Sequence, residues 1–366
     1  MFTISLNQKA KVASMCGFAS GKVNPIYEQV HIETSGSTVI ISACNGVQYC
    51  SVSLEADVQE QIKFCVSAKR LAVVTTALAG DRAKFTLKEG NLIVTSGRSR
   101  LKVQTFNSKE YPDMQPIASP ESRITLTVGE LESMVNQASY CVASSDVRAY
   151  LCHMNWKIFE DHTVVVSATD GHRLSQISQS LTSSAGSGSY LVPTTLFQAV
   201  ISQKLDLEDI CEVAFQDGKA SITAQNFKIV STLGDGQYPD IERVIPTDTT
   251  SKATFDLNEL SDLVKRVHAV ASLEKTPVIK FHFITSGHCE LTVQSSEKGN
   301  EFCESINLKD HSLSSDMTIG VNSKYLVEAL SKQSGSEVMF ILNTQSAIRI
   351  QSEMAKLVTL VMPIRC

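Results

Sequence analysis

The sequence of 366 residues contains ten cysteines but lacks any pair in Cys-x-x-Cys spacing. Structural zinc sites usually need such paired ligands, and small disulfide-rich domains need a compact cysteine framework. The spacing therefore argues against both a zinc site and a disulfide scaffold. We expect the cysteines to be reduced and to lie mostly in the core as small hydrophobic side chains.

Long hydrophobic runs are also missing. The longest mainly apolar stretch, residues 71–79, is far too short to cross a bilayer, and the opening MFTISLNQKAK lacks the apolar core of a secretory signal. With 43% hydrophobic and 19% charged residues, the composition is that of an ordinary folded protein. We therefore expect a cytoplasmic protein with no membrane partner, and its length predicts two or three domains.

What the sequence does contain is an internal repeat. Stretches that start at residues 1, 123 and 252 each open with a short alternating strand and continue as a helix. A second block, starting at 64, 190 and 319, has a strand, then a Ser, Pro or Asn that can open a helix, then an amphipathic helix. In the third copy the predicted apolar stripe of the first helix comprises Leu257, Leu260, Val264, Val267 and Ala271.

The repeat predicts three domains, 1–120, 121–248 and 249–366, each close to the commonest domain size. The boundaries fall in ASPES and PTDTTSK, which have the Pro, Ser and Thr expected of linkers. We expect an α+β fold in which each domain has two helices and about eight short strands, with Glu-Gly or Asp-Gly hairpins in two copies. The Ser/Gly run at 180–189 predicts a mobile loop in the second domain.

The segment SATDGHRLSQ at 167–176 places Asp170, His172 and Arg173 within four positions. A hydrolase would also need a nucleophile or a metal, and a base held by a third group. No nucleophile elbow, His-Glu-x-x-His helix or phosphate-binding loop accompanies the segment. The simpler interpretation is a turn at Asp170-Gly171 in which Asp170 or His172 bonds to local backbone. We predict no metal and no cofactor; a hydrolase that uses Asp170 and His172 stays an alternative, as does a scaffold that binds no nucleic acid.

Three such units, the ATDGHRL motif, the segment GQYPDIERVIP and the ending VMPIRC together resemble the bacterial sliding clamps, the β subunits of DNA polymerase III. The resemblance covers the whole chain. It implies clamp-type domains, each with two helices backed by antiparallel sheets, that close into a head-to-tail dimeric ring around double-stranded DNA. The implied function is that of a processivity factor, with no catalytic activity and no sequence specificity. The implied partners are DNA, a second copy, the polymerase III α subunit, the clamp loader and other proteins with a clamp-binding motif.

The resemblance further implies a pocket for short peptides, in which apolar residues receive a Leu or Phe anchor and polar groups bind the peptide backbone. Its expected residues are Leu151, Thr169, Gly171, His172, Arg173, Leu174, Pro239, Arg243, Val244, Tyr325, Ser346, Val361, Met362, Pro363, Ile364 and Arg365. Gln345, Ala347 and Cys366 depart from the family pattern, and the first two are expected to alter one edge of the pocket.

DNA binding by a chain of net charge −5 requires that the cations gather on one surface. The resemblance and the positions of cations on the predicted helices together give the expected DNA-contacting residues: Lys22, Lys69, Arg70, Arg148, Tyr150, Lys204, Lys265, Arg266 and Lys332. The alternative is that these cations only keep helix faces soluble. Ala149 in place of an aromatic residue, and Thr194 and Thr195 in place of an Arg-Lys pair, should weaken the DNA contact of the second domain.

The dimer joint implied by the resemblance lies between residues 269–277 of one chain and 101–106 of its partner. Val270, Ala271 and Leu273 offer only modest apolar surface there. We therefore expect the joint to depend on backbone pairing as well as on burial.

Overall fold

The computed structural model of the chain describes residues 1–216, 218–294, 301–342, 346–352 and 356–364. Its contacts group the chain into two compact units, which are treated separately below. The first unit is Met1–Glu132, Ile158–His162 and Leu181–Gly234; the second is Ser133–Lys157, Thr163–Ser180 and Asp235–Cys366. The second sequence copy contributes to both units, and the boundaries near residues 120 and 248 stay predictions.

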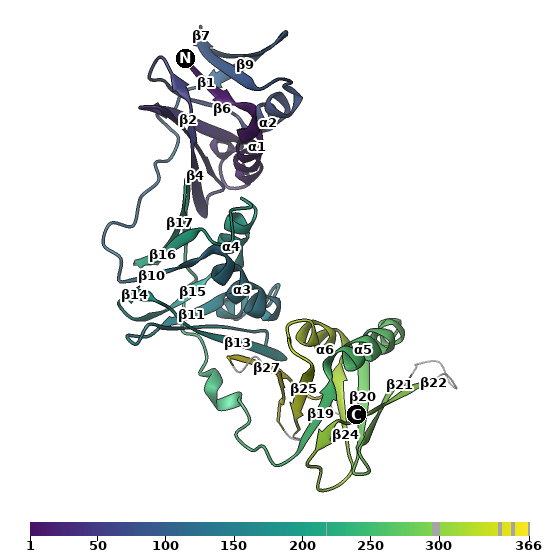
Figure 1. Cartoon of the computed structure of the whole chain (residues 1–366). Coiled ribbons are helices and arrows are strands. Elements are labelled where there is room, and N and C mark those ends of the chain that lie inside the picture. Colours follow the sequence, from purple (N-terminus) through teal and green to yellow (C-terminus); the bar gives the residue numbers. More distant parts are fainter. Residues whose placement is uncertain (217, 295–300, 343–345, 353–355, 365–366) are drawn as a thin grey trace. The chain divides into compact units, whose positions relative to one another are not determined.

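The three copies share one order of elements, in which each of two helices directly follows a strand (Figure 1). The first copy has β1 (Phe2–Ser5), α1 (Lys9–Phe18), β2 (Gln29–Ser35), β3 (Thr38–Cys44), β4 (Gln48–Glu55), β5 (Asp57–Val58), β6 (Lys63–Ser67), α2 (Ala68–Ala77), β7 (Arg82–Lys88), β8 (Asn91–Ser96) and β9 (Ser99–Phe106). The second has β10 (Ser122–Thr127), α3 (Val128–Ala138), β11 (Met154–Ile158), β12 (Thr163–Thr169), β13 (Arg173–Ser180), β14 (Ser183–Ala185), β15 (Gly188–Val192), α4 (Thr194–Ile201), β16 (Ile210–Gln216), β17 (Lys219–Ala224) and β18 (Phe227–Thr232). The third has β19 (Lys252–Asp256), α5 (Leu257–Ala271), β20 (Val278–Ile284), β21 (His288–Gln294), β22 (Glu301–Asn307), β23 (Asp310–His311), β24 (Met317–Asn322), α6 (Ser323–Leu330), β25 (Glu337–Ile341), β26 (Ile348–Ser352) and β27 (Leu357–Val361).

The helices begin at the polar residues or the proline that the sequence indicated. The Ser67 side chain accepts a hydrogen bond from the Arg70 N–H, and Asn322 Oδ1 accepts from the Lys324 N–H at 3.0 Å. Such caps satisfy backbone donors that have no partner inside the helix. Pro193 precedes α4 without a side-chain cap. No helix in the described part of the chain is long and apolar enough to cross a membrane.

One antiparallel sheet forms most of the first unit. Its strand order is β14-β10-β16-β17-β18-β4-β3-β2-β6-β9-β8-β7-β1-β5, so β18 of the second copy pairs directly with β4 of the first. Ile229 of β18 lies opposite Cys50 of β4 in this pairing. Backbone pairing across the two copies covers strand edges that would otherwise be free to associate with other chains.

The second unit repeats this arrangement between the second and third copies. Its strands run in the order β11-β12-β13-β27-β26-β25-β19-β23, so β13 of the second copy pairs with β27 of the third. Leu174 lies opposite Leu360 across that junction. A separate sheet, β22-β21-β20-β24, completes the third copy. The prediction of an α+β fold with two helices in each copy and antiparallel sheets is therefore confirmed.

The Ser/Gly run at 180–189 is not the loop that its composition indicated. Residues Ser183–Ala185 form β14, which pairs with β10 as β5 pairs with β1 and β23 pairs with β19. With this short strand, each copy has nine strands in the described part of the chain, where eight had been expected. Composition misled here because a sheet edge needs only backbone hydrogen bonds, which serine provides as well as any other residue.

The core contains the residues that the helical stripe predicted. Leu257, Leu260, Val264, Val267 and Ala271 are all buried and pack with the phenylalanines of the third copy's strands. Seven of the nine described cysteines are buried, Cys152 is partly buried and Cys303 is exposed; none is in a disulfide. Burial raises the pKa of the Cys16 thiol to about 12, so this group stays protonated and behaves as a small apolar side chain.

Gly188 provides a test of the packing beneath β15. A Cβ at this position would lie 2.4 Å from the Tyr190 hydroxyl oxygen, and the Tyr190 ring is fixed by stacking on Phe215 at 4.2 Å and by a 2.8 Å hydrogen bond with Ser122. Gly188→Ala should therefore lower the free energy of unfolding by about 1–3 kcal/mol, measured by denaturant unfolding. Gly17→Ala is the control, because nothing lies within 4 Å of the added Cβ in α1; it should raise stability by up to about 1 kcal/mol. Equal effects would contradict this view of β15.

Candidate functional site

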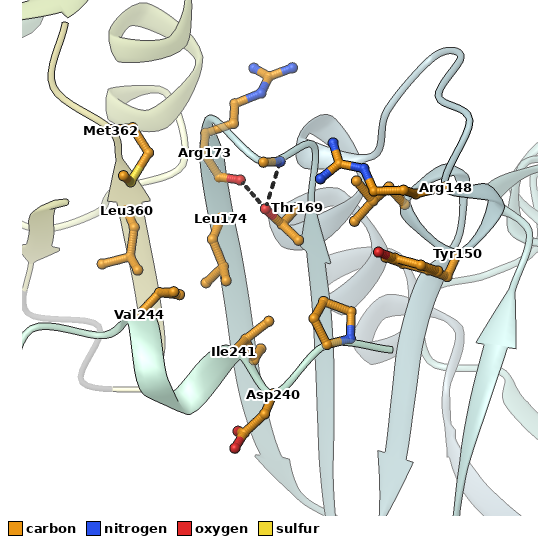
Figure 2. Close-up of a pocket in the computed structure, with 13 residues that line it drawn as sticks. Arg148, Tyr150, Thr169, Arg173, Leu174, Asp240, Ile241, Val244, Leu360 and Met362 are labelled. Carbon is orange, nitrogen blue, oxygen red and sulfur yellow. Dashed lines mark hydrogen bonds between the residues drawn. The ribbon is translucent and has the colours of Figure 1, made fainter. Parts of the chain in front are cut away.

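The segment that joins β12 to β13 is a tight turn held by its own side chains. Asp170 Oδ1 accepts hydrogen bonds from the backbone N–H groups of His172 at 2.9 Å and Arg173 at 3.1 Å. The Thr169 hydroxyl donates to the Arg173 carbonyl at 2.6 Å and accepts from the Gly171 N–H at 3.1 Å (Figure 2). Gly171 has φ +87°, a region that favours glycine. The prediction of a turn in which Asp170 bonds to local backbone is confirmed.

Arg173 connects this turn to the third copy. Its Nε donates to Asp170 Oδ2 at 2.9 Å, and its Nη1 donates to Glu328 of α6. The guanidinium carbon lies 4.4 Å from the centre of the Tyr325 ring, and the side chain is 11% exposed. Burial works against the charge, but the hydrogen bond to Glu328 and the neighbouring acidic groups raise the pKa of Arg173 above its ordinary value. Asp170 and Arg173 are therefore bonded to one another, and Arg173 also bonds to Glu328 across the junction. These contacts argue against the hydrolase alternative.

A cavity of about 230 Å³ opens beside the turn, entirely within the second unit (Figure 2). Its floor is apolar: Leu174 and Leu360 face one another across the β13–β27 pairing and belong to a small core cluster with Ile241 and Ala347. Along its wall, Val244 and Met362 are 51% and 41% exposed. Large exposed apolar side chains around a concave site favour the binding of another apolar group.

The polar groups of the cavity lie at its rim. The Arg148 guanidinium donates to both carboxylate oxygens of Asp146, each at 2.9 Å, and these hydrogen bonds lower the pKa of Asp146 to about 2. The Tyr150 ring lies edge-on to Tyr238, with 6.5 Å between ring centres. No group of three or more His, Cys, Asp or Glu side chains among the described residues is placed to hold a metal ion.

The structure brings half of the predicted pocket residues together. Those that line the cavity are Leu151, Thr169, Gly171, Arg173, Leu174, Pro239, Val244 and Met362. Those that lie outside its lining are His172, Arg243, Tyr325, Ser346, Val361, Pro363 and Ile364. His172 stacks on Tyr325 with 6.5 Å between ring centres, and Arg243 pairs with Asp240 at 2.9 Å. Arg365, Gln345 and Cys366 lie outside the described residues.

Five lining residues were not predicted as part of the pocket: Arg148, Tyr150, Asp240, Ile241 and Leu360. Arg148 and Tyr150, which had been expected at DNA, also line the cavity, and their contact with DNA stays a prediction. Asp240 and Ile241 belong to the segment QYPDIERVIP, so the repeated Tyr-Pro-Asp motif was the available signal. Leu360 could have been found from the alternation of side chains that places it on the same face as Met362.

The other residues predicted to contact DNA fall into two groups. Lys22, Lys69, Arg70 and Lys204 belong to the first unit, are exposed and make no ion pair in the described part of the chain. In the second unit Lys265 pairs with Asp262 at 3.2 Å, Arg266 pairs with Glu304 at 2.5 Å, and the Lys332 ammonium lies 5.7 Å from the centre of the Tyr140 ring. The first group therefore offers more available positive charge.

The comparisons with known proteins agree along the whole chain. The sequence models of the DNA polymerase III beta subunit match its N-terminal domain at residues 5–115, its central domain at 125–240 and its C-terminal domain at 242–365. The beta sliding clamp of Streptococcus pneumoniae strain R6 is 26% identical over 329 residues, which cover 86% of this chain and 84% of that protein. The beta sliding clamp of Vibrio cholerae is 28% identical over 284 residues, covering 76% and 72% of the two chains.

Solved structures show the same fold. The crystal structure of the DNA polymerase III beta chain from Streptococcus pneumoniae TIGR4 has a TM-score of 0.92 at 20% identity and covers 100% of this chain and 99% of that one. The Pseudomonas aeruginosa sliding clamp bound to griselimycin has a TM-score of 0.92 at 22% identity, with the same coverage. With all three domain models matched in order, the chain belongs to the DNA polymerase III beta subunit family, the sliding clamps of bacterial DNA replication.

Proposed function

We propose that this chain is a cytoplasmic DNA sliding clamp with domains near 1–120, 121–248 and 249–366. Two copies close head to tail around double-stranded DNA and tether the replicative polymerase and other proteins as a processivity factor, without catalysis. The observation that carries the proposal is the apolar cavity beside the Asp170 turn, in a chain that the family matches from end to end. Because a ring holds DNA by enclosing it, the protein needs no base contacts and no sequence preference.

The cavity is suited to a short peptide with an apolar anchor. Its volume of about 230 Å³ can accept one or two large side chains, and Leu174, Leu360 and Ile241 supply an apolar floor. Met362 at the rim is flexible and can adapt to different partners. Several proteins that carry one apolar motif can therefore use the same site in turn.

Met362→Ala tests this pocket. The variant should bind a fluorescein-labelled Ser-Asp-Leu-Phe-Asp-Ser peptide about 5- to 30-fold more weakly, because about 1–2 kcal/mol of anchor contact is lost. Fluorescence anisotropy measures the affinity. Met339→Ala, on β25 and outside the cavity lining, is the matched control. If both variants bind like the unmodified protein, the pocket is placed wrongly.

The proposed ring joint uses two exposed apolar side chains. Phe106, at the end of β9, is 43% exposed, and Leu273, just after α5, is 83% exposed. In the described part of the chain, β9 pairs with β6 only at Thr105 and Phe106, which leaves most of that strand edge available. We propose that a second copy covers this edge and that Phe106 of one chain and Leu273 of its partner lie within the joint.

Leu273→Glu should convert the dimer to a monomer, because a buried unpaired carboxylate costs several kcal/mol at an interface of modest apolar area. Sedimentation equilibrium measures the mass. Val147→Glu is the control, since Val147 is fully exposed and belongs to neither of the two segments proposed for the joint. A Leu273→Glu protein with an unchanged dimer mass would disprove the proposed joint.

The proposed DNA contact rests mainly on the first unit. Helices α1 and α2 carry Lys9, Lys11, Lys69 and Arg70 and no acidic residue, whereas α3 carries Glu130 and Glu132. Lys69 and Arg70 lie in the first turn of α2, where their charge is exposed. We propose that they, with Lys22 and Lys204, contact phosphates, and that the paired cations of α5 contribute less.

The double variant Lys69→Ala, Arg70→Ala should bind linear duplex DNA more weakly. The slope of log affinity against log salt should fall by about 2, because two phosphate contacts are lost. Arg82→Ala with Lys84→Ala, exposed on β7, removes the same charge elsewhere in the first unit and should leave the slope unchanged. An equal loss in both double variants would mean that only net charge matters.

A further inference from the structure

The first copy contains a turn built like the one at Asp170. The segment ACNGVQ at 43–48 matches ATDGHR at 168–173, and it joins β3 to β4 as the latter joins β12 to β13. Asn45 Oδ1 accepts hydrogen bonds from the N–H groups of Val47 at 3.1 Å and Gln48 at 2.8 Å. Gly46 has φ +94°, close to the +87° of Gly171. Two turns with the same internal bonds thus precede the two strands that pair across copies.

Gln48 takes the place of Arg173. It is 3% exposed, and its Nε2 donates to Thr195 Oγ1 at 3.0 Å and to Ser231 Oγ at 3.3 Å. Thr195 lies at the start of α4, as Glu328, the partner of Arg173, lies in α6. A neutral amide therefore makes the connection between turn and helix that an ion pair makes at the other junction.

The strands and the linker also correspond. Tyr49 lies opposite Val230 in the β4–β18 pairing, as Leu174 lies opposite Leu360 in the β13–β27 pairing. The linker after the first copy reads Tyr-Pro-Asp-Met at 111–114, and the one after the second reads Tyr-Pro-Asp-Ile at 238–241. The turn, the paired strands and the linker of the first cavity therefore each have a counterpart between the first and second copies.

A second cavity lies where these counterparts meet. Its volume is about 220 Å³, and it lies wholly within the first unit. Tyr27, Tyr49 and Val230 line it, together with Met114 of the linker and Val47 of the turn. Val47 is 53% exposed, close to the 51% of Val244 on the wall of the first cavity. The site is thus concave, largely apolar and open to solvent.

The chemistry of the second cavity differs from that of the first. Two tyrosine rings replace leucines, which favours a flat or branched apolar group. At the rim, exposed Lys219 of β17 supplies a cation that can pair with an acidic neighbour of the anchor, and exposed Asp113 supplies an anion that can pair with a basic one. The cavity therefore suits a peptide with an apolar anchor and an acidic residue placed to reach Lys219.

We propose that this second cavity, at the β4–β18 junction, is a docking site for a short peptide segment of a partner protein with one large aliphatic or aromatic anchor and an acidic residue that pairs with Lys219. One chain would then hold two peptides at once, one at each junction. The proposal does not depend on ring closure or DNA binding, because the second cavity lies within one unit of a single chain.

Isothermal titration calorimetry of the full-length protein with the peptide Ser-Asp-Leu-Phe-Asp-Ser tests the proposal. We expect two peptides per chain, and one per chain for Val47→Asp and for Val244→Asp, which place a carboxylate on the equivalent wall of each cavity. The double variant should bind none. Both residues are about half exposed, so the single variants should keep the thermal unfolding midpoint of the unmodified protein.

A single peptide per chain that is lost in Val244→Asp and retained in Val47→Asp would overturn the second site and leave the first intact. If peptide binding is lost in Val47→Asp and retained in Val244→Asp, the second site is supported and the first pocket is overturned. If neither variant loses peptide binding, or if the unmodified protein does not bind the peptide, both sites are overturned. If Val47→Asp changes the oligomeric state, the cavity is an interface between copies and the peptide proposal is wrong.

In the Val244→Asp background, Lys219→Ala should weaken binding about threefold, and Lys228→Ala, outside the lining, should not. If Lys219→Ala and Lys228→Ala bind the peptide with equal affinity, Lys219 does not recognise an acidic neighbour of the anchor, and that part of the proposal is wrong.

Discussion

The pairing of β13 with β27 is the interaction on which the candidate site depends. Asp170 closes the turn that precedes β13, and Arg173 fixes this turn to α6, so that β13 is positioned to pair with β27. Once the strands are in register, Leu174 and Leu360 are brought together, and the linker segment with Ile241 covers the cluster that they form. Residues from four separate parts of the sequence, 148–151, 169–174, 239–244 and 360–362, therefore form one cavity.

Enclosure of DNA by the proposed ring explains how a protein with net charge −5 can act on DNA. A protein that encloses DNA needs little chemical affinity for it, so the modest set of exposed cations that we propose at DNA, mainly on α1 and α2, is compatible with a negative net charge. Selectivity is needed only for protein partners, and we propose that the cavity provides it through shape and apolar contact. Most residues proposed for the two tasks differ, although Arg148 and Tyr150, expected at DNA, also line the cavity.

The repeated sequence predicted most of the fold, because strand alternation, helical stripes and caps such as Ser67 and Asn322 are local signals. β14 was missed, since pairing at a sheet edge depends on a neighbour and not on the Ser/Gly composition of residues 183–185. The resemblance supplied eight of the cavity residues. The expected roles of His172 at the peptide and of Arg148 at DNA stay predictions; the His172 ring stacks on Tyr325, and Arg148 lines the cavity. Sequence spacing could not give these positions, because the direction of a side chain in a turn depends on its tertiary contacts.

The junction of β4 with β18 rests on a neutral amide, whereas that of β13 with β27 rests on a guanidinium between two carboxylates. Dissolved ions screen charge pairs but leave amide-to-hydroxyl bonds nearly unchanged, even though partial burial of Arg173 limits the effect. The two strand junctions between sequence copies therefore respond differently to ionic strength. Raised ionic strength should therefore weaken the β13–β27 junction more than the β4–β18 junction.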